Sequence, residues 1–172
     1  MSVRTLMIAS VIALLPSLAD AQDRAQTRQG FWFNAGAGFG SLGCRGCDDR
    51  QSAVTLALGA GGTLSQKVLL GASIDGWTTS QRTVAALLAR LRFYPSVTSG
   101  FFLTGGLGLG RWQADGTDAN SSDTGTSELI GLGYDVPLGP DLSLTPFWNW
   151  FAIQTTNDDH NVMQLGLSLT VP

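Results

Sequence analysis

Two cysteines, Cys44 and Cys47, have a spacing that can carry chemistry. They stand in the segment CRGC, inside the polar stretch 41–51, which we predict to be a surface loop. A thioredoxin-type redox pair would need a helix start beside a βαβ unit, and a zinc site would need a second pair of ligands. The sequence supplies neither, although Asp48 and Asp49 leave metal binding or thiol chemistry open as the alternative. We predict that the two cysteines form a short disulfide that closes the loop.

His160 is the only histidine, so acid–base catalysis of the usual kind would depend on it. It stands in the acidic stretch 154–161, where we expect a solvent-exposed loop histidine. Other predicted loops also carry aspartates, whose oxygen atoms are ligands for hard cations. No spacing among them matches a calcium loop, so we predict no metal site, no catalytic residue and no cofactor.

A set of polar residues recurs on one side of the apolar segments: Asn34, Asp75, Arg90, Arg92, Tyr94, Asp135, Asn149 and Gln164. Arg90 and Arg92 fix the side, because an arginine facing hydrocarbon near mid-depth costs about 2 to 4 kcal/mol. We therefore predict that the set faces the interior of a narrow barrel and satisfies its own buried charges as a polar network. A proton or ion path along the network is the alternative.

The elements that must position these residues are strands, and the stretch 99–112 (SGFFLTGGLGLGRW) shows this best. Phe101, Leu103, Leu107 and Leu109 alternate with a row composed mostly of glycine, and period two is the mark of a strand. A soluble sandwich would bury the bulky row. The small row is better explained as the crowded interior of a barrel, with the leucines facing lipid.

The same alternation marks eight strands, at 30–40, 52–62, 67–78, 81–94, 99–112, 127–136, 142–153 and 162–171. Each approaches the roughly 9 to 11 residues that a tilted strand needs to cross a bilayer. Short joins alternate, with one exception at 79–80, with longer polar ones such as 113–126. We therefore predict an all-β, antiparallel, up-and-down transmembrane barrel with both termini in the periplasm.

The composition agrees with one such domain in the 172-residue chain. Charged residues form 13% of the chain, about half the usual share, and no apolar run is long enough for a spanning helix. The net charge of -3 argues against a nucleic-acid surface. Residues 1–21 have the basic start, apolar core and Ala-Asp-Ala end of a cleaved signal peptide. We expect 22–29 to be a flexible lead-in and 30–172 to form the barrel.

The mature chain resembles the small OmpA-type outer-membrane β-barrel domains of Gram-negative bacteria. The resemblance lies in GAGFGSLGCRGC at 36–47, GGTLSQKVLLG at 61–71, the segment 94–110, and the closing LSLTPFWNW and NVMQLGLSLTVP. It implies an outer-membrane location, contact with membrane lipid and lipopolysaccharide, insertion by the barrel-assembly machinery, and a monomer. Many such barrels end in an aromatic residue, whereas this chain ends in Thr170-Val171-Pro172.

The resemblance carries no known reaction, so we expect a non-enzymatic protein that serves envelope structure or adhesion through its loops. One alternative is a lipid A deacylase or acyltransferase, since such enzymes share this size and strand number. A deacylase of that kind has a serine two residues after its histidine, where this chain has Val162. A second alternative, a secreted soluble barrel that carries a small apolar ligand, would need its large residues inside.

Overall fold

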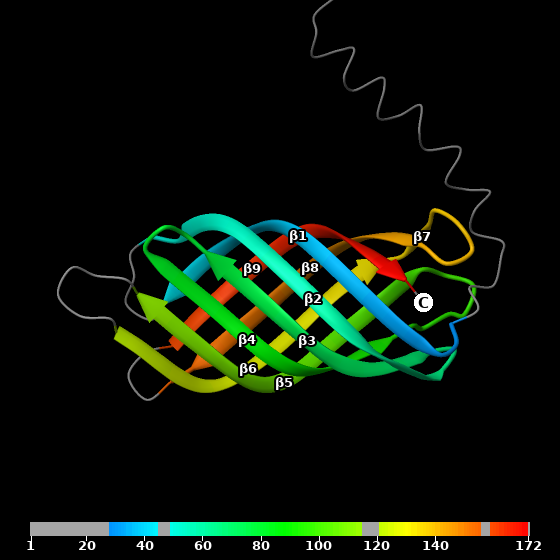
Figure 1. Cartoon of the computed structure of the whole chain (residues 1–172), viewed down its shortest axis with the longest axis horizontal. Coiled ribbons are helices and arrows are strands. Elements are labelled where there is room, and N and C mark those ends of the chain that lie inside the picture. The colour runs from blue at the N-terminus through cyan, green and yellow to red at the C-terminus, as the bar shows by residue number, and fades with distance from the viewer. Residues whose placement is uncertain (1–27, 45–48, 115–120, 156–158, 172) are drawn as a thin grey trace, which may run out of the picture.

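The computed structural model describes residues 28–44, 49–114, 121–155 and 159–171, and it is a barrel of antiparallel strands (Figure 1). The strands are β1 (Phe31–Cys44), β2 (Gln51–Ser65), β3 (Val68–Thr78), β4 (Arg82–Phe93), β5 (Phe101–Ala114), β6 (Ser121–Tyr134), β7 (Val136–Pro137), β8 (Ser143–Gln154) and β9 (Asp159–Val171). Within those residues no helix is long and apolar enough to span a bilayer.

The sheet closes on itself because β1 pairs with both β2 and β9, and β6 pairs with β8. The two-residue β7 continues the line of β6 along β8, so the wall has eight strand positions, as predicted. Following the paired residues once around the wall leads from Phe33 back to β1 at Gly43, ten residues further along. Strand number and stagger together set the width, and eight strands leave an interior that side chains fill.

The predicted faces are confirmed. On β5, Leu103, Leu107 and Leu109 expose 45%, 70% and 60% of their surface, whereas the alternate residues Phe102 and Thr104 are buried. The same alternation runs through the other long strands, so that a belt of exposed leucine, isoleucine, valine and phenylalanine surrounds the barrel. A soluble protein rarely exposes so large an apolar surface, which is instead the surface that a bilayer covers.

The two ends of the barrel differ. The connections β2–β3, β4–β5 and β7–β8 lie at the end that also holds the C-terminus, here called the terminal end (Figure 1). The C-terminal ends of β1, β3, β5 and β8 lie at the opposite end, here called the loop end (Figure 1). This division follows the predicted alternation of short and longer joins.

The strands reach further at the loop end than predicted. Positions 41–44, 113–114, 121–126 and 159–161 lie in strands, although the sequence suggested loops. Serine, threonine and asparagine can continue a hydrogen-bonded ladder once it has left the hydrocarbon. Polarity in this chain therefore marks where the apolar belt ends, and the strands continue beyond it.

The N-terminal segment was expected to be frayed up to residue 29. Arg28 instead is 6% exposed, and its guanidinium donates to the carbonyl oxygen of Ser99 at 3.0 Å. The predicted signal peptide and residues 22–27 lie outside the described residues. The barrel domain thus gains an ordered residue ahead of its predicted start.

Candidate functional site

The centre of the lumen holds an ion pair between β3 and β4. Arg90 Nη1 lies 3.6 Å from Asp75 Oδ2, and the two residues are 3% and 0% exposed. Ser73 donates to the same carboxylate oxygen at 2.9 Å, and Arg90 Nε donates to Thr104 Oγ1 at 3.0 Å. Period two brings all four side chains inward from three neighbouring strands. The pair is stabilised because hydrogen bonds accompany the charges into the interior.

Asn149 on β8 connects this pair to the far wall. Its side-chain oxygen accepts from Arg90 Nη2 in either orientation of the amide, at 3.2 or 3.3 Å. In one orientation the amide nitrogen donates to Gln164 Oε1 at 3.4 Å, and in the other to the Trp148 carbonyl at 3.1 Å. Three of the predicted residues, Asp75, Arg90 and Asn149, therefore form a central cluster across the barrel, and Gln164 joins it in the first of the two orientations.

A second cluster lies at the terminal end around Asp135, between β6 and β7. Tyr94 Oη donates to Asp135 Oδ2 at 2.7 Å, and Thr145 Oγ1 donates to Asp135 Oδ1 at 2.6 Å. Thr170 lies 3.1 Å from the Thr145 hydroxyl. The guanidinium carbon of Arg28 lies 3.5 Å from the centre of the Tyr94 ring, so a cation covers the cluster.

The structure does not join the eight predicted residues into one network. Arg92 is 2% exposed, and its guanidinium carbon lies 4.8 Å and 5.0 Å from the ring centres of Phe102 and Trp32. Within the described residues, its Nε and Nη1 and the side-chain oxygen of Asn34 have no hydrogen-bond partner. Arg92 and Asn34 thus lie in the lumen as predicted, but outside both hydrogen-bonded clusters.

An apolar layer closes the lumen on the loop side of the central cluster. Its most deeply buried members include Trp77, Val84, Phe151, Ile153 and Val162. Trp77 also donates its indole N–H to the Gly40 carbonyl at 3.1 Å. Together with a second hydrophobic cluster at the terminal end, formed by Trp32, Leu69, Tyr94 and Phe102, this layer encloses the polar centre. The described side chains thus fill the lumen as a plug.

The expectation of a solvent-exposed His160 was wrong. His160 is 6% exposed, and its ring stacks on Trp112 with centroids 5.2 Å apart and planes inclined by 6°. The reason is that β9 begins at Asp159, which places His160 inside the strand and on its inward face. The histidine therefore belongs to the packing at the loop end.

Cys44 ends β1 and is disulfide-bonded. Cys47, the other cysteine of the sequence, lies outside the described residues, so the Cys44–Cys47 pairing stays a prediction. In the β1–β9 ladder, the backbone of Cys44 lies opposite that of His160. Within the described residues, no group of three or more His, Cys, Asp or Glu is placed to hold a metal ion.

The disulfide can be tested by thiol labelling of the purified, denatured protein. Without reductant we expect a polyethylene-glycol maleimide to modify neither cysteine, and after reduction to modify both. Cys44→Ser is the control, because it should leave Cys47 reactive without reductant. Labelling of the untreated wild-type chain would contradict the pairing.

The predicted network omits several residues of the clusters. Alternation places Ser73, Thr104 and Thr145 on the inward face, and Thr170 shares that parity, but their short hydroxyl side chains were not included in the predicted set. Arg28 precedes the first strand, and no pattern in the sequence indicates its position. Alternation along a strand predicts which face a side chain is on. Which side chains then contact one another depends on the stagger between the strands.

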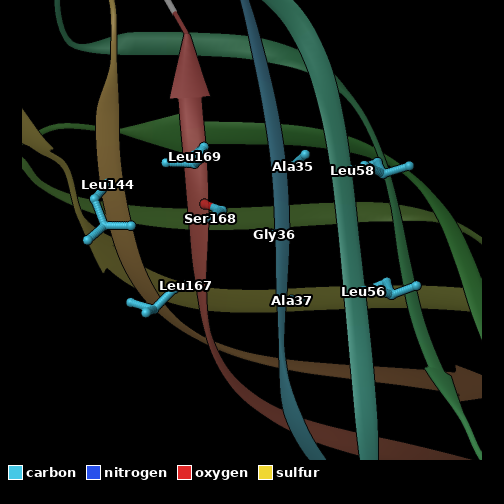
Figure 2. A pocket seen from close by; sticks show the side chains of 9 residues that line it. All are labelled: Ala35, Gly36, Ala37, Leu56, Leu58, Leu144, Leu167, Ser168 and Leu169. Carbon is cyan, nitrogen blue, oxygen red and sulfur yellow. The ribbon is translucent and has the colours of Figure 1, made fainter. Parts of the chain in front are cut away.

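The outer wall carries a shallow apolar groove of about 470 Å³ (Figure 2). Its floor is Ala35 and Ala37 on β1, and leucines of β2 and β9 form its sides, because Leu58 and Leu169 pair with Ala35, and Leu56 and Leu167 with Ala37. No ionisable side chain lines the groove. It offers contact to hydrocarbon and no catalytic group.

No protein-family model matches the chain, and neither does any curated protein. Among solved structures, Neisserial surface protein A (NspA) is similar with a TM-score of 0.71 and 14% identity, over 83% of this chain and 96% of that one. Ail, the attachment invasion locus protein of Yersinia pestis, solved in complex with the heparin analogue sucrose octasulfate, has a TM-score of 0.61 and 14% identity, over 83% of this chain and 99% of that one.

The chain has the fold of the small eight-stranded outer-membrane β-barrels. This outer-membrane barrel also carries the exposed apolar belt that the location requires, so its predicted place in the cell outer membrane is confirmed. Inside it, one ion pair, hydrogen bonds and aromatic contacts among the described residues fill the lumen.

Proposed function

We propose that this outer-membrane barrel is non-enzymatic and acts through its loop end, in envelope structure or in attachment to another surface. The filled lumen is the observation that carries the proposal, because it leaves the outer surface as the place for interaction. The likeness to a surface protein and to an attachment invasion locus protein supports the same direction. The proposal places the barrel in the outer membrane with its loop end facing the cell exterior and both termini facing the periplasm.

Attachment can be tested with cells of a non-adherent Gram-negative host that display the chain. We expect binding to immobilised glycans or matrix proteins to exceed that of cells with an empty vector. In a matched variant, residues 115–120 are replaced by a glycine-serine segment of equal length, and this variant should lose binding while keeping its amount in the outer membrane. Equal binding by displaying and empty-vector cells would argue for a role in envelope structure alone.

The filled lumen also predicts that the wild-type barrel forms no steady channel. In planar bilayers we expect no porin-like conductance, because Trp77, Phe151 and Ile153 block the loop side of the polar centre. Trp77→Ala removes the largest of these side chains and is the comparison variant. Regular, stable openings of the wild-type protein would contradict the plug and favour the ion-path alternative.

A lipid A-modifying activity is the alternative, and two positions argue against it. His160 is covered by Trp112, and Val162, at the position of the serine in a deacylase, is 0% exposed. We expect the mass of lipid A to be unchanged after incubation with the purified barrel. A loss of acyl chains that His160→Ala abolishes would establish the enzyme instead.

A further inference from the structure

Arg50, immediately before β2, is held on the outer face of the wall by three hydrogen bonds. Its Nε donates to Ser41 Oγ at 2.9 Å, its Nη2 to the Ser41 carbonyl at 2.5 Å, and its Nη1 to Asn161 Oδ1 at 2.9 Å. The acceptors belong to β1 and β9, so the side chain reaches across two other strands. Such a fixed guanidinium is unusual for an exposed arginine, which ordinarily samples many rotamers.

Gly43 makes room for this arrangement. A Cβ atom at Gly43 would lie 2.5 Å from Arg50 Nη1 and 3.1 Å from the guanidinium carbon. Gly43 is buried although its position on β1 is an outward one, because Arg50 covers it. The strand therefore leaves a space on its outer face that the guanidinium occupies.

The guanidinium lies at the upper edge of the apolar belt. On β1, Ser41 is the next outward position above Phe39, and on β9, Asn161 is the next outward position above Met163. The side chains of Phe39 and Met163 are 74% and 45% exposed. Below this level the outward positions of β1 and β9 are apolar, from Phe31 to Phe39 and from Met163 to Val171, whereas Ser41, Asn161 and Asp159 above it are polar. In a bilayer, this level is the one at which lipid headgroups begin.

The N–H donors of Arg50 that are not used in these hydrogen bonds favour one kind of ligand. A guanidinium has five N–H donors, of which three are used here, and Arg50 makes no ion pair among the described residues. Asp49 and Asp159 stand at the same rim, so attraction of an anion depends on the directed donors and not on a general positive field. Phosphate oxygens match the guanidinium fork in geometry and charge.

We propose that Arg50 is a binding site for the phosphate of an outer-leaflet lipid headgroup, such as that of a phosphorylated glycolipid. This inference rests on the outer-membrane orientation given under the proposed function and names the lipid contact that the wall makes. Ser41, Gly43 and Asn161 position the arginine, and its two unused donors bind the phosphate. Phe39 and Met163 contact the upper part of the acyl chains.

The experiment uses the full folded chain, purified in mild detergent and offered either phosphorylated or enzymatically dephosphorylated lipid A. Native mass spectrometry counts the retained lipids per barrel. We expect the wild type to retain phosphorylated lipid A, and Arg50→Gln to weaken retention by about tenfold, because a charge-assisted hydrogen-bonded contact is lost. Dephosphorylated lipid A should bind weakly and equally to both proteins.

Matched variants separate binding from folding. Arg82→Gln removes an exposed arginine at the same rim but with inward parity, and it should retain the lipid like the wild type. Arg50→Lys keeps the charge without the fork and should weaken retention by a smaller factor. Heat-modifiable gel mobility reports whether each variant is folded. If Arg50→Gln does not fold, Asn161→Ala replaces it, since it releases the guanidinium but keeps the charge.

Three results would overturn the proposal. The first is equal retention of phosphorylated lipid A by the wild type and by the folded Arg50 variants. The second is equal retention of the phosphorylated and dephosphorylated lipids by the wild type. The third is complete displacement by millimolar inorganic phosphate, which would assign a free-phosphate site. None of them bears on attachment by whole cells, so the proposed function is judged separately.

Discussion

Arg90→Ala is expected to destabilise the barrel by about 3 to 5 kcal/mol, because it leaves a buried carboxylate without its cation. Asp75 is 0% exposed and has only the Ser73 hydroxyl as a further hydrogen-bond donor among the described residues. The substitution also removes the donors to Thr104 and Asn149. Urea titration of the barrel in lipid vesicles, followed by gel mobility without heating, measures the change in free energy of unfolding.

The control is the double variant Asp75→Asn with Arg90→Met, which removes both charges and keeps most of the volume. It should recover most of the loss, since replacing a buried ion pair by groups of similar volume is often close to neutral. An Arg90→Ala barrel as stable as the wild type would show that water or another group already compensates Asp75. The Arg90–Asp75 ion pair would then not be what stabilises the centre of the lumen.

Gly108→Ala is expected to have the second large effect, about 1 to 3 kcal/mol or more, because there is no space for one added carbon. A Cβ atom at this inward position of β5 would overlap the carbonyl oxygen of Leu87 on β4 and lie 2.9 Å from the Leu88 Cα atom. Both are backbone atoms, so relief requires the two strands to separate. The same titration in vesicles measures the loss.

Gly105→Ala is the matched control on the same strand. Its added Cβ would face outward, and the Leu129 carbonyl oxygen would lie 3.8 Å from it, an ordinary van der Waals distance. We expect a change within about 0.5 kcal/mol, as for a surface substitution. Equal effects at the two glycines would mean that glycine acts through chain flexibility and not through the tight approach of β4 and β5.

Alternation predicted the fold and the two faces of the wall because a closed sheet in lipid requires period two in each crossing strand. The contacts within the lumen depend on the stagger of ten residues, which alternation does not determine. Arg90 and Arg92 illustrate this limit, since they share a strand and a face. One reaches Asp75, whereas the other lies between Trp32 and Phe102.

The positions outside the belt were harder to predict. His160 and Arg50 lie in segments whose polarity suggested loops, yet one packs on Trp112 and the other crosses to β1 and β9. Outside the hydrocarbon layer, polar residues occur both in strands and in turns. The composition of a polar segment therefore does not predict whether it is a strand or a loop. Arg28 is the corresponding case at the terminal end.

The pairing of β1 with β9 has a consequence for biogenesis. The first and last strands of the chain form the seam of the cylinder, with twelve register pairs from Phe33–Val171 to Cys44–His160. Until synthesis and export have delivered the final strand, β1 has an open edge whose N–H and C=O groups cannot be satisfied in hydrocarbon. A chain truncated before Asp159 should therefore stay with periplasmic chaperones or be degraded, and closure should be the last, committing step of insertion.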